Sequence, residues 1–212
     1  MMRKVLISLI LFYSCLNAQI DISASMGLDI KNSPVLKDYI NMNFAKGSNQ
    51  ISSFKSSVSF VPEIDYKIQR DFAIGIEYSL QIDSYSNSVG AGGIYEISYY
   101  IHRPSILAYY VVPGEGYQFK FGGGLGYRYA ALTEKIFTSS NYTADGIGFL
   151  IKAEGNTLLS KNLYALIGGN LRYDSIGELS NGSYKIKNNS TGENLNLSSI
   201  SFGIYLGLTF SF

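Results

Sequence analysis

The chain has 212 residues, of which 46% are hydrophobic and only 16% charged, and its 17 basic and 16 acidic side chains almost cancel. This balance excludes the strongly basic surface of a nucleic-acid-binding protein, so we expect no nucleic-acid partner. The 22 glycines, 18 tyrosines and 12 phenylalanines, together with the absence of tryptophan, indicate β-structure rather than the helix-rich composition of an ordinary cytosolic enzyme.

The N-terminus is predicted to be a secretory signal peptide over residues 1–18. Two basic residues precede an apolar run from Val5 to Tyr13, and small or polar residues follow as far as Ala18. A charged segment followed by an apolar segment too short to cross a bilayer as a helix is typical of such a signal. Cleavage after Ala18 would leave residues 19–212 as a single domain without cysteine.

The rest of the chain alternates between apolar and polar residues, which is the period of a β-strand. The clearest example is residues 117–129, where tyrosine, phenylalanine and leucine share one face while glycine, lysine and arginine share the other. Eight segments follow this pattern, the one at 94–112 least regularly. They are 20–30, 54–68, 72–82, 94–112, 117–129, 147–155, 163–173 and 200–212.

The connections between these segments alternate between long and short, which is typical of a membrane barrel with long extracellular loops and tight periplasmic turns. The predicted long loops are 31–53, 83–93, 130–146 and 174–199, and the predicted turns are 69–71, 113–116 and 158–162. In the seven regular segments the apolar face carries no Asp, Glu, Lys or Arg. The pattern predicts an all-β fold, a closed antiparallel up-and-down transmembrane β-barrel of eight strands.

The last strand carries a family resemblance. Residues 204–212 place apolar side chains at every second position and end on a phenylalanine. This resembles the terminal-strand signal by which the barrel-assembly machinery recognises bacterial outer-membrane β-barrels. The residues that carry this assembly signal are Leu206, Leu208, Phe210 and Phe212. With the signal peptide and the upstream strands, the mature chain resembles small eight-stranded outer-membrane barrels of the OmpA, OmpX and OmpW-like group.

Two prolines interrupt the alternation. Continuing the register of Tyr95 to Ile101 would place Arg103 in lipid, where an arginine costs roughly 2–4 kcal/mol. We therefore expect a bulge near Pro104 that turns Arg103 inward and the residues from Ile106 to Val112 outward. Pro62, in the second strand, predicts a bulge or a weakened hydrogen-bond ladder.

One candidate catalytic pair stands beside this proline. His102 is the only histidine and lies three residues before Ser105. A lipid-modifying barrel enzyme with a His, Ser and acidic triad needs the base within hydrogen-bond reach of the nucleophile. Residues three apart in a regular strand point to opposite faces, so the pair meets only if the strand is bulged. We expect no enzymatic activity, and no residue for a metal or cofactor is predicted.

Charged residues on the polar face form the other candidate site. An eight-stranded barrel is just wide enough to be filled by its own side chains, so these charges have to pair inside it. The predicted interior ionic network comprises Glu63, Glu77, Arg103, Lys120, Lys152, Glu154 and Arg172. It is interpreted either as a plug or as a polar path for solutes.

The expected function is a non-enzymatic structural or surface-interaction role, exerted by extracellular loops that bind an unknown ligand. A narrow channel for small or hydrophobic solutes is the alternative, followed by a lipid-modifying enzyme and then a secreted soluble barrel. Expected partners are outer-membrane lipids and the barrel-assembly machinery, and we expect a monomer.

Overall fold

The computed structural model describes residues 20–45, 47–53, 55–89 and 93–212. The predicted signal peptide and its cleavage site lie outside these residues. The long strands are β1 (Ile20–Asn32), β2 (Lys55–Gln69), β3 (Phe72–Val89), β4 (Gly93–Pro113), β5 (Tyr117–Lys135), β6 (Ser139–Ser160), β7 (Leu163–Ile176) and β10 (Ser199–Ser211). The shorter elements are α2 (Pro34–Asn43), the 3₁₀ turn η1 (Gly47–Asn49), β8 (Ser180–Asn181) and β9 (Tyr184–Lys185). No helix among the described residues is long and apolar enough to cross a membrane.

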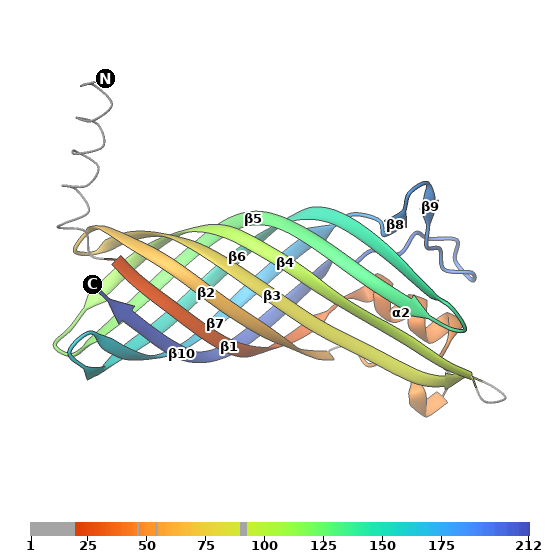
Figure 1. Cartoon of the computed structure of the whole chain (residues 1–212), viewed down its shortest axis with the longest axis horizontal. Coiled ribbons are helices and arrows are strands. Elements are labelled where there is room, and N and C mark those ends of the chain that lie inside the picture. Colours follow the sequence, from red (N-terminus) through yellow and green to blue (C-terminus); the bar gives the residue numbers. More distant parts are fainter. Residues whose placement is uncertain (1–19, 46, 54, 90–92) are drawn as a thin grey trace, which may run out of the picture.

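The eight long strands form a closed antiparallel barrel, as predicted. Each strand pairs with its neighbour in the sequence, and β1 closes the ring by pairing with β10 from Asp21 opposite Ser211 to Asn32 opposite Ile200. The C-terminus and the start of β1 lie at one end, whereas α2, β8 and β9 lie at the other (Figure 1). Closure leaves no strand edge to be desolvated by lipid.

The turns at the two ends differ in length, as predicted for a membrane barrel. At the end that holds the C-terminus the strands are joined by two- or three-residue turns, and Gly116 adopts a φ of 76°, which a glycine tolerates without strain. The connections from β1 to β2 and from β7 to β10 are long and lie at the opposite end. By the rule that periplasmic turns are short, this opposite end is extracellular.

Two predicted loops are wrong. Residues 83–89 and 93, and most of residues 130–146, are strand, because β3 and β4 pair as far as Val89 and Gly93, and β5 and β6 pair as far as Lys135 and Ser139. Polar alternation in these segments reflects hairpins that continue beyond the lipid, where both faces of a strand can be polar without ending it.

The predicted bulge at Pro104 is also wrong. β4 keeps one parity throughout, so Tyr95, Ile97 and Ile101 face the interior together with Arg103. The pairing of β3 with β4 runs without a shift from Phe72–Tyr110 to Val89–Gly93. The prediction assumed that apolar residues face lipid, whereas the outer part of this strand contributes to an apolar core inside the barrel. Pro62 sits opposite Ala24 with no register shift, so the bulge is wrong there too. The pairing of β2 with β3 is nevertheless interrupted at Val61 and Pro62, as the alternative of a weakened ladder predicted.

The barrel wall is apolar on the outside and mixed on the inside. Outward positions of β10, such as Ile204, Leu206 and Leu208, are 50–63% exposed, whereas the intervening Tyr205 is 2% exposed. The interior is divided along the axis into a charged region, on the periplasmic side, and an apolar region under the extracellular loops. An apolar exterior around a filled interior is the surface of a membrane barrel rather than of a soluble one.

Candidate functional site: the filled lumen and the lipid-facing wall

Lys152 lies at the centre of the charged region. Its Nζ is 2.5 Å from a carboxylate oxygen of Glu63, 3.0 Å from Glu77 and 2.8 Å from Glu154, and all four side chains are at most 3% exposed. The Tyr109 hydroxyl donates a hydrogen bond to Glu63 at 2.7 Å, and the Tyr205 hydroxyl donates one to Glu154 at 3.0 Å. One ammonium thus holds three carboxylates that would otherwise repel one another in a space with little water.

Further ion pairs continue this network towards the periplasmic end. Lys120 Nζ is 2.6 Å from Asp65 and 3.0 Å from Asp21. Lys67 is 3.1 Å from the same Asp21 carboxylate, and Ser211 of the last strand donates to it at 2.7 Å. The charges at this end therefore also tie the first strand of the barrel to the last.

Two arginines organise the network on its extracellular side. Arg103 is 2.8 Å from Asp174 and 3.4 Å from Asp29, and it donates to Gln81 at 2.7 Å. Arg128 is 2.5 Å from the other oxygen of Asp174. The arginine fork suits such sites because its five donors can satisfy several fixed acceptors at once.

The structure places all seven predicted network residues inside the barrel. Among them, Arg172 is 2.8 Å from Glu77. The prediction did not include seven further buried charges, although they share the inward parity. These are Asp21, Asp29, Lys31, Asp65, Asp83, Arg128 and Asp174. The fourteen buried charges comprise eight acidic and six basic groups, and the partly buried Lys55, Lys67 and Glu134 also face the interior.

Above the charges, the extracellular loops close the lumen with an apolar core. Ile40 of α2 and Leu179, Leu195 and Leu197 of the last loop are each at most 1% exposed and pack with Ile97 of β4. Burial, and then the hydrogen bond that the Tyr39 hydroxyl donates to Glu134 at 2.5 Å, raise the pKa of Tyr39 well above its ordinary value. Two loops far apart in the sequence therefore form one lid.

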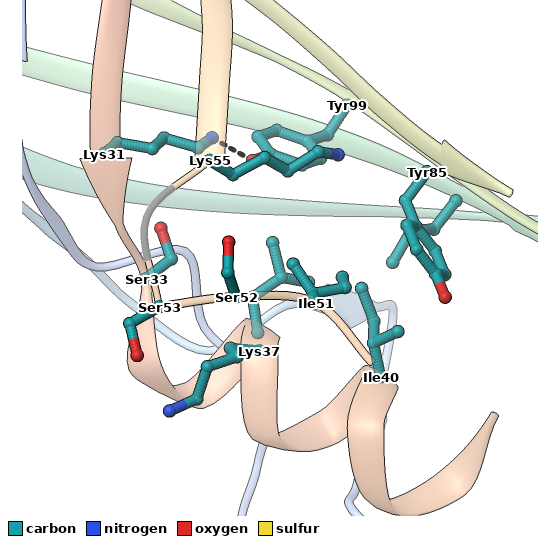
Figure 2. Close-up of a pocket in the computed structure, with 12 residues that line it drawn as sticks. Lys31, Ser33, Lys37, Ile40, Ile51, Ser52, Ser53, Lys55, Tyr85 and Tyr99 are labelled. Carbon is teal, nitrogen blue, oxygen red and sulfur yellow. Dashed lines mark hydrogen bonds between the residues drawn. The ribbon is translucent and has the colours of Figure 1, made fainter. Parts of the chain in front are cut away.

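A small cavity marks the boundary between charged and apolar regions. It lies between β1, the first loop and the inner face of β4, and has a volume of about 20 Å³. Figure 2 shows the Lys31 ammonium directed at Tyr99, to whose hydroxyl it donates a hydrogen bond, while Ile40 and Ile51 approach from the loop. This volume holds about one water molecule and no ligand.

The candidate catalytic pair is separated by the wall of the barrel. His102 faces outward, where the Tyr78 hydroxyl and its Nδ1 share a hydrogen bond. Ser105 faces inward and accepts a hydrogen bond from Arg128 at 3.1 Å. No group of three or more His, Cys, Asp or Glu side chains among the described residues could hold a metal ion. The strand period thus keeps the predicted base away from the predicted nucleophile.

No family model matches the chain, and no curated protein matches it in sequence. Its fold does match solved structures. Ail, the attachment invasion locus protein of Yersinia pestis, has a TM-score of 0.54 at 11% identity, and Neisserial surface protein A has 0.52 at 14% identity, each over 92% of this chain and 99% of the other. The outer membrane protein OprG of Pseudomonas aeruginosa has 0.50 at 15% identity, covering 92% and 96%.

The fold and these likenesses define the class. The chain is a small eight-stranded β-barrel of the type found in bacterial outer membranes, which confirms the fold and the resemblance inferred from the terminal strand. Its apolar outer wall is consistent with the expected location in that membrane. The residues of the predicted assembly signal, Leu206, Leu208, Phe210 and Phe212, all lie on the outward face of the closing strand or at its end.

Proposed function

We propose that this protein is a non-conducting, non-catalytic outer-membrane barrel that presents its extracellular loops as a rigid contact surface. The observation that carries the proposal is the filling of the lumen along its length. The ion pairs from Asp21 to Arg103 occupy the periplasmic and central parts, and the apolar core around Ile40 occupies the extracellular part. A path for solutes would require removing paired charges and then the lid.

The loops supply the surface for contact because they are packed on the barrel rather than free. Asn43 donates to Asn188 at 3.2 Å, which joins the first and last loops. Beside this assembly, the hairpin of β5 and β6 carries Phe137, which is 89% exposed, and β9 carries Tyr184, which is 65% exposed. Exposed aromatic side chains on a preorganised support favour binding of a partner, because little ordering has to occur on contact.

Conductance distinguishes this role from the alternative of a narrow channel. Purified protein in planar bilayers should give no stable current, and Lys152→Met should not create one while the apolar lid remains in place. A stable open conductance in the unaltered protein would overturn the proposal. Binding is tested by displaying the protein on cells and comparing their adhesion with cells that carry Phe137→Ser and Tyr184→Ser, for which we expect a loss of adhesion.

The non-catalytic part of the proposal has its own test. His102→Ala should leave the acyl-chain composition of lipid A unchanged, because His102 and Ser105 lie on opposite faces of β4. Mass spectrometry of lipid A from cells with and without the protein decides this. If lipid A lost an acyl chain and this loss depended on His102, the protein would be a lipid-modifying enzyme and the non-catalytic role would be wrong.

A further inference from the structure

Two ionisable side chains stand out on the lipid-facing wall. Among the outward positions of the eight barrel strands that the structure describes, the His, Asp, Glu, Lys and Arg residues are Glu96, His102, Lys135 and Asp145. Glu96 and Lys135 lie beyond the others on the extracellular side and pair with each other at 3.1 Å. His102 and Asp145 remain as charged or polar groups directed at the membrane.

These two residues are aligned across three adjacent strands. His102 of β4 sits opposite Tyr129 of β5, and Tyr129 sits opposite Asp145 of β6. Neighbouring strands are about 4.8 Å apart, so the backbone positions of His102 and Asp145 are about 10 Å apart with an aromatic ring between them. The spacing accommodates a headgroup of the size of one or two sugar rings.

Other tyrosines complete this polar cluster. The ring of Tyr100 meets that of His102 edge-on, with centroids 5.2 Å apart. The Tyr127 hydroxyl donates a hydrogen bond to Asp145, and Tyr78 shares one with His102. Both ionisable groups are therefore held in place by tyrosines of their own wall, as expected for a preorganised binding site.

The cluster lies at the depth of lipid headgroups. Val112 and His102 are ten residues apart on β4, and ten residues of a strand tilted by about 40° span about 25 Å of bilayer, the height of the apolar band of an outer-membrane barrel. Val112 is next to the short turn between β4 and β5, so the His102 end of this distance is on the side of the long loops and the cluster faces the outer leaflet.

An apolar groove begins directly below the cluster on the same strands. It has a volume of about 440 Å³, and its lining includes Ile106, Leu125, Ile147 and Phe149. Ile106, Leu125 and Phe149 form one row across β4, β5 and β6, four residues along each strand from the row that contains His102. A polar platform above an apolar groove matches an amphiphile in its membrane orientation.

We propose that this face binds one outer-leaflet glycolipid, with its sugar headgroup on His102, Tyr129 and Asp145 and an acyl chain along the groove. A sugar is favoured over a phosphate because no lysine or arginine belongs to the cluster, and phosphate sites are built around these residues. Sugar hydroxyls can donate to the Asp145 carboxylate and accept from tyrosine hydroxyls. This proposal is independent of the proposed role of the loops. It requires only that the end with the long loops is extracellular, so that the cluster lies in the outer leaflet.

A second groove provides a control within the same wall. It is larger, about 660 Å³, and is lined by residues of β1, β2 and β10 that include Leu28, Val58 and Phe202. No His, Asp, Glu, Lys or Arg side chain faces outward on these three strands, all of whose residues the structure describes. Comparing lipid binding at the two grooves therefore distinguishes nonspecific contact with lipid chains from recognition of a headgroup.

The experiment uses single tryptophans as reporters, because the chain contains none. Phe149→Trp reports on the proposed site and Phe202→Trp on the control groove. Diglucosyl diacylglycerol, a glycolipid that carries no phosphate, is titrated into phosphatidylglycerol nanodiscs that contain either the Phe149→Trp or the Phe202→Trp protein. We expect a fluorescence change that saturates at one glycolipid per barrel for Phe149→Trp and no saturating change for Phe202→Trp.

Substitution of the cluster tests the headgroup contacts. Adding His102→Ala and Asp145→Asn to the Phe149→Trp protein should weaken binding about five-fold, which corresponds to about 1 kcal/mol. Folding is checked by gel mobility without heating, and Asp145→Asn alone replaces the double variant if that fails to fold. Equal responses from both reporters, unchanged binding by the cluster variant, or an equal response to cardiolipin, which has phosphates and no sugar headgroup, would each overturn the proposal.

Discussion

The two regions of the lumen fill the same barrel by opposite means. In the charged region every partner comes from the strands themselves, as in the contact of Lys152 on β6 with Glu63 on β2 and Glu77 on β3. In the apolar region the strands supply only half of the core, and Ile40 and Leu197 arrive from loops. The charged region is thus an integral part of the wall, whereas the apolar region depends on segments that could detach while the wall remains closed.

Tyr99 joins the two regions. Its hydroxyl donates to Asp83 at 2.7 Å, while its ring packs in the apolar core and carries the Lys31 ammonium 4.1 Å from its centroid. An amphipathic side chain satisfies both environments at once, as tyrosines do wherever one end is apolar and the other polar. The difference between the regions therefore predicts distinct responses to substitution.

The largest effect is expected from variants that prevent the barrel wall from forming, because neither region of the lumen can then exist. Phe210→Ser combined with Phe212→Ser should leave most of the chain in the periplasm, because the closing strand loses its terminal aromatic residues at the interface. Fractionation of cells and gel mobility without heating measure the folded, membrane-inserted fraction. The matched control is Phe137→Ser, at a hairpin tip outside the barrel wall. Equal membrane yield for all three proteins would contradict the assigned signal.

The next largest effect is expected in the charged region. Lys152→Met leaves Glu63, Glu77 and Glu154 without their shared cation, and breaking a buried pair costs about 3–5 kcal/mol. Thermal or urea denaturation in detergent should show this loss while strand content stays the same.

Two further variants separate this effect from a general effect of charge removal. Adding Glu154→Gln should restore part of the stability, because it removes one of the uncompensated carboxylates. Lys135→Met, which removes a surface cation, should leave the free energy of unfolding almost unchanged. Equal destabilisation by Lys152→Met and Lys135→Met would mean that the buried network does not stabilise the barrel.

A smaller and more local effect is expected in the apolar region. Ile40→Ala removes a side chain that is 1% exposed, and such truncations cost about 2–5 kcal/mol. Because Ile40 is on α2, hydrogen exchange should accelerate in residues 34–53 and 179–197 while the barrel strands remain protected. Asp38→Ala, on the same helix at a side chain that is 47% exposed, is the control. Faster exchange throughout the strands would show that lid and wall unfold together.

The smallest expected effect concerns one hydrogen bond of the lid. Tyr39→Phe removes one of the two tyrosine donors to Glu134, leaving Tyr95, and should lower the stability of the lid by about 1 kcal/mol. The raised pKa of Tyr39 keeps it protonated when the lid is closed, whereas in the open lid it ionises near its ordinary value of 10.0. The contribution of this group is therefore complete below pH 10 and is lost as the pH rises above it.

This sign makes the pH dependence a test. Hydrogen exchange in α2, corrected for its intrinsic pH dependence, should show the lid of the unaltered protein loosening above about pH 10. The Tyr39→Phe lid should be less sensitive to this rise. An identical pH dependence in the two proteins would remove Tyr39 as the titrating group.

The wall could be predicted from the sequence because its physics is local. Alternation with period two and an apolar outer face fix the parity of β10 and of the segment from Tyr117 to Tyr129, and the structure has both. The predicted strand ends were wrong where the chain leaves the lipid, because a strand outside the lipid no longer needs an apolar face by which the sequence could reveal it. For β4 the same rule failed in the opposite sense, since Tyr95 and Ile97 are apolar and yet face inward towards the loops.

The pairing inside the lumen could be predicted only in part. Lys152 and Glu154 share a face by the strand period, and the structure pairs them at 2.8 Å. Lys152 and Glu63 are 89 residues apart, and their contact at 2.5 Å depends on how far the strands are staggered when the barrel closes. Stagger is a property of the closed ring, which no single strand encodes.

The pairing of the first strand with the last has a consequence for the order of events during folding. Ser211 donates to Asp21 across 190 positions of the sequence, and the whole β1–β10 ladder joins residues at comparable separations. Contacts of such long range are slow to form, because the entropy of closing the loop opposes them until neighbouring contacts exist. The ring can close only after β10 has been synthesised, so until then the edges of β1 and of the last strand made are unpaired.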